Sequence, residues 1–304
     1  MSDYSLFTLF AHIKLLFEQS ATLFYLSVIF ISLAIGSFLN VVVYRLPKMM
    51  AYSWYHECRE YLADEVKDID AKKITAMTLS TPNSTCPQCD HKIRFYENVP
   101  ILSWLLLKGK CSQCKKAIAI RYPLVELSTA LLSLLVANHF GVSMQTFWAL
   151  FITWALIALT LIDVDHMLLP DQITLPLLWL GLLVNINGTF IPLTDAVIGA
   201  AVGYMSLFTV FWLFKLVTGK EGMGFGDFKL LSVFGAWLGW QLLPLLILMA
   251  SVVGAIVGVS LIVFKKHQRD QAIPFGPYLA VAGWITLLWG NTLWSWYLQH
   301  LVLI

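Results

Sequence analysis

Charged residues are scarce in this sequence. Only 12% of the 304 residues are Asp, Glu, Lys or Arg, whereas about 25% is usual for a soluble domain, and 59% are hydrophobic. This balance excludes an ordinary soluble globular protein and predicts a protein that crosses a membrane several times. The first 20 residues also lack a basic start followed by a small-residue cleavage site, so we expect no cleaved signal peptide.

Several catalytic and binding motifs are missing as well. The sequence has no HExxH motif, no GxxxxGK[ST] phosphate-binding loop, and no module of basic and aromatic residues that would bind nucleic acids. Ser37 lies within an apolar stretch, but no histidine is evident as its partner. These absences argue against a zinc metalloprotease, a P-loop NTPase, a nucleic-acid-binding protein and a serine nucleophile.

Eight apolar segments follow one another along the chain, and several approach the roughly 20 residues that span a bilayer as a helix. They cover residues 20–44, 123–140, 146–162, 172–190, 195–217, 229–240, 242–264 and 273–300. We therefore predict an all-α polytopic membrane protein with about eight transmembrane helices, and seven or nine are the alternatives. The predicted domains are an N-terminal segment with the first transmembrane helix (1–44), a small water-facing insert (45–122) and a transmembrane domain (123–304).

The positive charges lie almost entirely on one side of this predicted topology. Thirteen of the 20 Lys and Arg residues lie in the insert, and Lys14 alone lies on the opposite side of the membrane. Because cytoplasmic loops carry the excess of Lys and Arg, we predict that the insert faces the cytoplasm. The loops that hold Asp163 and Asp227 then also face the cytoplasm.

Four of the five cysteines form two CxxC pairs in the insert. Cys86 and Cys89 are separated by 21 residues from Cys111 and Cys114. Two such turns can direct four thiolates at one ion, so we predict a structural Zn²⁺ site rather than disulfides or a redox pair. Four thiolates leave no open coordination position, so the metal should hold the fold of the insert rather than cut a bond. We interpret Cys58 as a packed residue on a helix face.

The second half of the chain has few acids, and two groups of them lie at the ends of apolar stretches. Asp163 and Asp165 end one stretch, and Asp227 begins another in Gly224-Phe225-Gly226-Asp227. A carboxylate near the hydrocarbon core of a membrane costs free energy, so its presence there indicates a functional role. A capping role would explain Asp227 but not the glycines, which permit a close backbone approach. Two carboxylates near one membrane surface are the minimum for an aspartyl protease, in which one activates water and the other donates a proton.

Several alternatives remain open. Asp163 and Asp165 point to different sides of a helix, so at most one of them faces a shared site. A proton- or cation-coupled transporter is the alternative function, although neither mid-membrane acids nor an internal repeat is evident. An assembly scaffold is another, but it leaves the GxGD segment unexplained. The acidic stretch 57–70, with a net charge of −4, is either a solvated helix face or a surface that attracts a basic substrate segment.

These motifs resemble those of the bacterial type IV prepilin leader peptidases, which are GxGD aspartyl proteases, along almost the whole chain. The matching segments are Gly36-Ser37-Phe38-Leu39-Asn40-Val41-Val42 with Tyr44-Arg45-Leu46-Pro47, the two CxxC turns, Arg121-Tyr122-Pro123-Leu124-Val125-Glu126, the block from Asp163 to Asp171, and Gly224-Phe225-Gly226-Asp227-Phe228-Lys229. The resemblance implies an inner-membrane protease that cuts the basic leader from type IV prepilins and type II secretion pseudopilins at the cytoplasmic face. It implies Asp163 and Asp227 as the catalytic acids, with Asp165 as the fallback for the first.

The resemblance also implies a second activity. Members that carry the cysteine loop methylate the new N-terminal amine with S-adenosyl-L-methionine. No Gly-rich nucleotide loop is present in this sequence, so the cofactor rests on the resemblance and no residues are assigned to it. The implied partners are prepilin and pseudopilin substrates and the lipid bilayer, and no nucleic acid.

Overall fold

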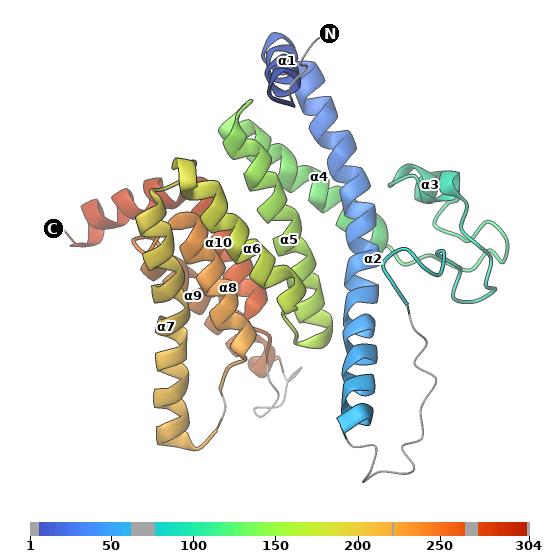
Figure 1. Cartoon of the computed structure of the whole chain (residues 1–304). Coiled ribbons are helices and arrows are strands. Elements are labelled where there is room, and N and C mark those ends of the chain that lie inside the picture. The colour runs from blue at the N-terminus through green and yellow to red at the C-terminus, as the bar shows by residue number, and fades with distance from the viewer. Residues whose placement is uncertain (1–5, 62–76, 221, 265–272, 303–304) are drawn as a thin grey trace. The chain divides into compact units, whose positions relative to one another are not determined.

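Helices make up most of the computed structural model, which describes residues 6–61, 77–220, 222–264 and 273–302 (Figure 1). The α-helices are α1 (Leu6–Gln19), α2 (Ala21–Tyr61), α3 (Leu102–Leu106), α4 (Arg121–Phe140), α5 (Met144–His166), α6 (Asp171–Val184), α7 (Leu193–Thr218), α8 (Phe225–Leu238), α9 (Leu243–Val263) and α10 (Gly276–Tyr297). The short turns are η1 (Phe95–Asn98), η2 (Asn185–Asn187) and η3 (Leu298–Val302). The structure is 77% helical, and its described residues form no strand. The prediction of an all-α protein is confirmed.

Within the described residues, five helices are long and apolar enough to cross a membrane, namely α2, α4, α5, α7 and α9. Each of the eight apolar segments predicted from the sequence contains a helix, but α6 and α8 have only 14 residues each. A helix of that length extends about 21 Å, whereas the hydrocarbon core of a bilayer is about 30 Å thick. The protein is therefore a multi-pass membrane protein, but the count of eight spans is not confirmed.

The chain divides into two compact units. One unit is Ala21–Leu134, and the other combines Met1–Ser20 with Leu135–Ile304. The boundary between them falls inside α4. The three domains expected from the sequence stay a prediction, because these units describe packing alone.

Helix α2 continues for 41 residues and passes Pro47 without ending. Its buried residues recur every three or four positions on both sides of the proline: Phe24, Val28, Ser32, Gly36, Leu39, Val43, Leu46 and Met50. A proline inside a helix costs about 3 kcal/mol. The continuous buried face offsets that cost, and it carries the helix well beyond residue 44, where the sequence analysis ended the first transmembrane segment.

Glu126 connects three parts of the unit Ala21–Leu134. Its carboxylate accepts a hydrogen bond from the backbone N–H of Ile101 (2.7 Å) and another from the hydroxyl of Ser37. Next to it, Gly36 of α2 lies so close to α4 that an added Cβ would be 2.8 Å from the Cα of Glu126. The motif Gly36-Ser37 therefore fits α2 against α4 and satisfies a buried acid.

Arg45 attaches the insert to α2. Its guanidinium is buried and donates to the backbone carbonyl oxygens of Thr78 (2.9 Å), Leu79 (3.4 Å) and Pro82 (2.7 Å). The planar fork of an arginine can bond several carbonyls at once, which a lysine cannot do with the same geometry. Arg45 thus fixes the beginning of the segment that leads to the first CxxC turn.

Helix α8 is the buried centre of the other unit. Every residue from Leu230 to Leu238 is buried, and the helix contacts α6, α7, α9 and α10. A helix that is apolar on all sides lies either in a protein core or in a membrane. The tertiary contacts of α8 explain its hydrophobicity, which the sequence analysis attributed to a membrane span.

Glycines allow the backbones of α7 and α8 to meet. Gly199 of α7 and Gly235 of α8 face each other so closely that a Cβ on either residue would overlap the backbone of the other. Gly203 follows one turn after Gly199 and also lies against the α8 backbone, which is the small-residue spacing of close-packed membrane helices. The hydroxyl of Ser232 then donates to the carbonyl of Ala200 (2.7 Å).

Two side-chain hydrogen bonds fix α8 to the region of α6. The indole N–H of Trp237 donates to the carbonyl of Leu177 (2.9 Å), and the amide of Asn185 donates to the carbonyl of Ala236 (3.0 Å). Buried polar groups are stable only with such partners. Both bonds lie near the C-terminal end of α8, so this end of the helix is held in one register relative to α6 and η2.

Candidate active site and metal centre

Asp163 lies in the last turn of α5 with only 5% of its surface exposed. The helix ends at His166, and Met167 adopts a left-handed backbone conformation (φ 52°) while its N–H donates to the carbonyl of Asp163. Asp165 is exposed. The structure therefore separates the two acids that the sequence left as alternatives, because only Asp163 points into the protein.

Asp227 lies in the first turn of α8 and is 7% exposed. Gly224 is the N-cap residue, and its backbone N–H donates to the Asp227 carboxylate, as in one half of a capping box. Gly226 is required for space, since an added Cβ would be 2.8 Å from the Cβ of Leu169. Capping thus accounts for the position of the carboxylate, and the close approach of α8 to the chain after α5 accounts for Gly226.

The beginning of α10 completes the arrangement. The backbone N–H of Gly276 donates to the Asp163 carboxylate, and a Cβ added to this glycine would be 2.5 Å from Asp163 Oδ2. The carboxyl groups of Asp163 and Asp227 interact electrostatically with each other. Two buried carboxyl groups with separate backbone donors can hold different protonation states, which is what a general acid and a general base require.

Lys229 and Asp171 form an ion pair beside these acids. The Lys229 ammonium lies 2.7 Å from both carboxylate oxygens of Asp171. Asp171 is the first residue of α6, where its charge also favours the positive end of the helix dipole. The ion pair therefore joins the first turns of α6 and α8.

Gly276 is the residue of this site that the sequence analysis missed. It lies in Pro274-Phe275-Gly276-Pro277, at the beginning of α10. A glycine between prolines at the beginning of a helix is a detectable local signal, because prolines favour the first helical turn and glycine allows close contact. The sequence could not show which side chain approaches it.

The four cysteines of the CxxC pairs come together in the insert. The Sγ atoms of Cys86, Cys89, Cys111 and Cys114 all lie within 4.8 Å of one another. Each pair belongs to a turn of the same design: the backbone N–H of the first cysteine bonds to the residue five positions later, and the residue after the second cysteine has a positive φ (Asp90 54°, Lys115 58°). The cluster is a group that could bind a metal.

The geometry fits a tetrahedral zinc site. Zn–S bonds of about 2.3 Å place the sulfurs of a tetrahedron about 3.8 Å apart, and the Sγ atoms of Cys86 and Cys114 are 3.8 Å apart. Backbone N–H groups of Cys114 and Gln113 lower the pKa of the Cys111 thiol to about 6. The Cys89 thiol accepts the N–H of His91, which favours the thiolate, but burial and the neighbouring cysteines raise its pKa to about 12. A bound cation would remove this conflict, because it stabilises all four thiolates together.

Glu97 supports the cysteine insert from the side. Its carboxylate accepts the backbone N–H of Arg94 (2.9 Å) and contacts the ring of His91 (3.2 Å). The Arg94 N–H, followed by the hydroxyl of Ser112, lowers the pKa of Glu97 to about 2. A carboxylate therefore bridges the first CxxC turn, through His91, and the second, through Ser112.

Cys58 and the acidic stretch 57–70 both lie on α2 or directly after it in the sequence. Cys58 is exposed on α2, so its interpretation as a packed residue is wrong. In the acidic stretch, Glu57 and Glu60 lie on the exposed surface of α2, while Asp64, Glu65, Asp68 and Asp70 lie outside the described residues. The hypothesis that this acidic stretch attracts a basic substrate segment therefore stays a prediction.

Two buried aspartates at helix ends, in an all-α membrane protein, are the arrangement that a membrane aspartyl protease requires. The sequence model described as the Type IV leader peptidase family matches residues 150–259, which include both aspartates. The model described as the Bacterial Peptidase A24 N-terminal domain matches residues 30–140, which include all four cysteines of the cluster. The chain belongs to the type IV leader peptidase family.

Curated relatives match over nearly their full length. Proteins named Prepilin leader peptidase/N-methyltransferase are 58% identical to the chain in Pseudomonas aeruginosa (91% of this chain, 94% of the relative), 54% in Aeromonas salmonicida (91% and 95%) and 44% in Legionella pneumophila (91% and 95%). No solved structure gives a significant match. The family assignment leaves the transporter hypothesis without support.

Proposed function

We propose that the protein removes the leader peptide from prepilins and pseudopilins and then methylates the new N-terminal amine. The observation that carries the proposal is the pair of buried carboxyl groups of Asp163 and Asp227, held by α5 and α8 within the region that matches the peptidase family. The two activities follow the name that the relatives share, Prepilin leader peptidase/N-methyltransferase.

Asp163 and Asp227 act as a general base and a general acid on one water molecule. One carboxylate takes a proton as the water oxygen attacks the scissile carbonyl carbon, and the other carboxyl group donates its proton to the carbonyl oxygen. Collapse of the tetrahedral intermediate breaks the C–N bond, and a proton passes to the leaving amine. No covalent bond to the enzyme forms. The N–H groups of Gly276 and Gly224 keep the two carboxyl groups in position through the cycle.

Cys86, Cys89, Cys111 and Cys114 would hold a structural Zn²⁺ ion in the insert. Four thiolate ligands would leave the ion no open position for a substrate, so it would contribute folding energy instead. S-adenosyl-L-methionine supplies the methyl group of the second activity. The insert and the catalytic acids face the cytoplasm of a bacterial inner membrane, because the Lys and Arg residues gather on that side of the predicted topology.

The decisive test is a cleavage assay with purified protein and a prepilin. Asp163→Asn and Asp227→Asn should each abolish leader removal, while membrane insertion and zinc content stay at the wild-type level. Asp165→Asn is the matched control, since this acid is exposed two residues from Asp163, and it should retain cleavage. Loss of cleavage in Asp165→Asn together with retention in Asp163→Asn would transfer the first catalytic role to Asp165.

Product mass separates the two activities. With S-adenosyl-L-methionine present, the mature pilin should be heavier by one methyl group, about 14 Da, than the product made without it. Cleavage without this increase would support the peptidase and reject the methyltransferase.

A further inference from the structure

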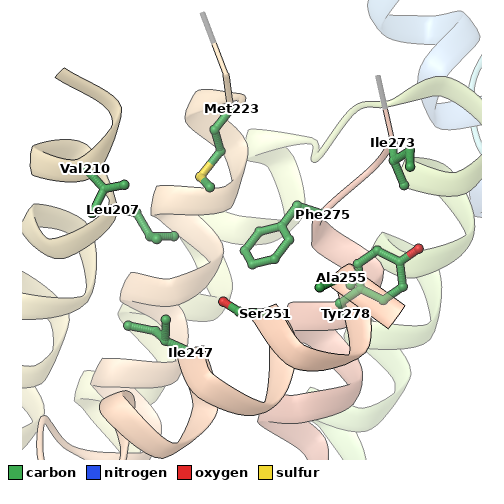
Figure 2. A pocket seen from close by; sticks show the side chains of 10 residues that line it. Leu207, Val210, Met223, Ile247, Ser251, Ala255, Ile273, Phe275 and Tyr278 are labelled. Carbon is green, nitrogen blue, oxygen red and sulfur yellow. The ribbon is translucent and has the colours of Figure 1, made fainter. Parts of the chain in front are cut away.

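A mostly apolar cavity of about 390 Å³ lies among α7, α9 and α10 (Figure 2). Helix α9 contributes one face through Ile247, Ser251 and Ala255, which recur every four residues, and Leu207 lies opposite on α7. The volume is in the range of small-molecule and side-chain pockets. A hydroxyl of Ser251 is one of the few polar groups in the lining.

Two walls of this cavity are joined to the catalytic pair through the backbone. Met223 and Phe275 point into the cavity, from the segments that precede α8 and α10 (Figure 2). Met223 directly precedes Gly224, whose N–H donates to Asp227, and Phe275 directly precedes Gly276, whose N–H donates to Asp163. Each of these lining residues is thus bonded directly to the residue whose N–H donates to a catalytic carboxylate, so the cavity begins within one residue of both donors.

We infer that this cavity is a specificity pocket, which takes a large apolar side chain of the substrate next to the scissile bond. The inference rests on the proposed peptidase function. Proteases obtain specificity from pockets that bind side chains flanking the cut. An apolar substrate side chain bound here would contact Met223 and Phe275, and the adjacent scissile peptide bond would then lie near Asp163 and Asp227.

A lipid acyl chain is the other occupant that an apolar cavity in a membrane protein could take. Met223 and Phe275 both directly precede the backbone donors of the catalytic carboxyl groups, and this favours the substrate as the occupant. A lipid site does not need to adjoin the catalytic pair (the dyad) of Asp163 and Asp227. Filling the pocket should then change which substrates are cut, and not only how well the protein is folded.

The test compares prepilins that carry either phenylalanine or alanine immediately before or immediately after the scissile bond. The ratio of kcat/KM for the phenylalanine and alanine substrates is measured with the full chain in detergent. Ala255→Phe fills the cavity and should lower this ratio at one of the two positions by about tenfold or more, the usual effect of size in an apolar pocket. Ser251→Leu, at an exposed position of the same face, should lower it in the same direction and guards against misfolding of the larger variant.

Val253→Phe is the matched control. Val253 is exposed on α9 and is not part of the lining, so the ratio should stay as in the wild type. Unchanged ratios in Ala255→Phe and Ser251→Leu, with a wild type that cleaves, would overturn the pocket alone. The same would follow if native mass spectrometry found a phospholipid on the wild type that Ala255→Phe loses while the ratios stay unchanged. A wild type that cleaves no prepilin would overturn the proposed function, and this inference with it.

Discussion

Gly226 and Gly276 give the two carboxyl groups of the site their positions. Neither glycine carries chemistry, but a Cβ on Gly276 would be 2.5 Å from Asp163 Oδ2, and one on Gly226 would be 2.8 Å from Leu169. Asp163 and Asp227 can both be buried because the residues packed beside them, Gly226 and Gly276, have no Cβ. At the scale of single residues, the acids and the glycines therefore form one unit.

Gly276→Ala should lower kcat for prepilin cleavage by about 100-fold, since a displacement near 1 Å of a catalytic group can cost that much. The added Cβ also overpacks a buried contact, so the variant should lose about 1–3 kcal/mol of stability and remain folded. Steady-state cleavage rates and a melting curve measured on the same preparation check both parts.

The control for this change is Gly258→Ala on α9, where the added Cβ would meet only Ile273 Cδ1 at an ordinary 3.6 Å. Its cleavage rate should match the wild type. A wild-type rate in Gly276→Ala would show that Gly276 does not position Asp163.

At the scale of helices, α8 depends on its contacts with α6 and α7. The glycines Gly199 and Gly235 bring the backbones of α7 and α8 together, and the ion pair between Lys229 and Asp171 joins the first turns of α8 and α6. The N-terminus of α8, which carries Asp227, is thus fixed from two sides.

Gly235→Ala should destabilise the protein by about 1–3 kcal/mol, which is the usual effect of overpacking a buried contact. The added methyl group has no space against the Gly199 backbone, so α7 and α8 must separate. Denaturation in mixed detergent micelles measures the loss, and Gly258→Ala again serves as the neutral glycine-to-alanine change. Equal stability of the two variants would contradict the close packing of α7 and α8.

The Lys229–Asp171 pair should contribute only about 0.2–1 kcal/mol to stability, because exposed ion pairs are screened by water. The side chains of Lys229 and Asp171 are 28% and 49% exposed. A double-mutant cycle with Lys229→Ala and Asp171→Ala gives this coupling energy. The same cycle on kcat for cleavage should show coupling too, since the pair positions the turn that holds Asp227. Additive effects on kcat would limit the ion pair to a structural role.

At the scale of the whole molecule, the candidate metal site and the candidate dyad belong to different compact units. The four cysteines lie in Ala21–Leu134, and both aspartates lie in the unit that contains Leu135–Ile304. Loss of the metal should therefore unfold the insert first, with the dyad's own packing intact.

Removal of zinc by a chelator should expose residues 77–120 to limited proteolysis while α5 to α10 stay resistant. Cys111→Ser should have the same effect and lower the zinc content from one ion per chain. Zinc should also be released as the pH falls, because protons compete for the thiolates. Elemental analysis and peptide mapping check these outcomes, with Cys58→Ser, which lies outside the cluster, as the control. Full zinc content in Cys111→Ser would contradict the predicted ligand set.

The amino-acid sequence by itself determined the class of protein and the residues of interest. The shortage of charge predicts a membrane protein, because each buried charge in a bilayer is costly. The CxxC spacing predicts a metal cluster, since the ligands of each turn are neighbours in the chain. Cys86, Cys89, Cys111, Cys114 and the three candidate aspartates could all be named in this way, because each signal is local.

Only the tertiary structure decided how distant segments meet. It buries Asp163 and exposes Asp165, although both end the same helix, and it adds Gly276 from α10 to the site. It also makes the short α8 a core helix and carries α2 past Pro47. Each of these outcomes depends on contacts between residues far apart in the chain, which hydropathy and motif spacing do not encode.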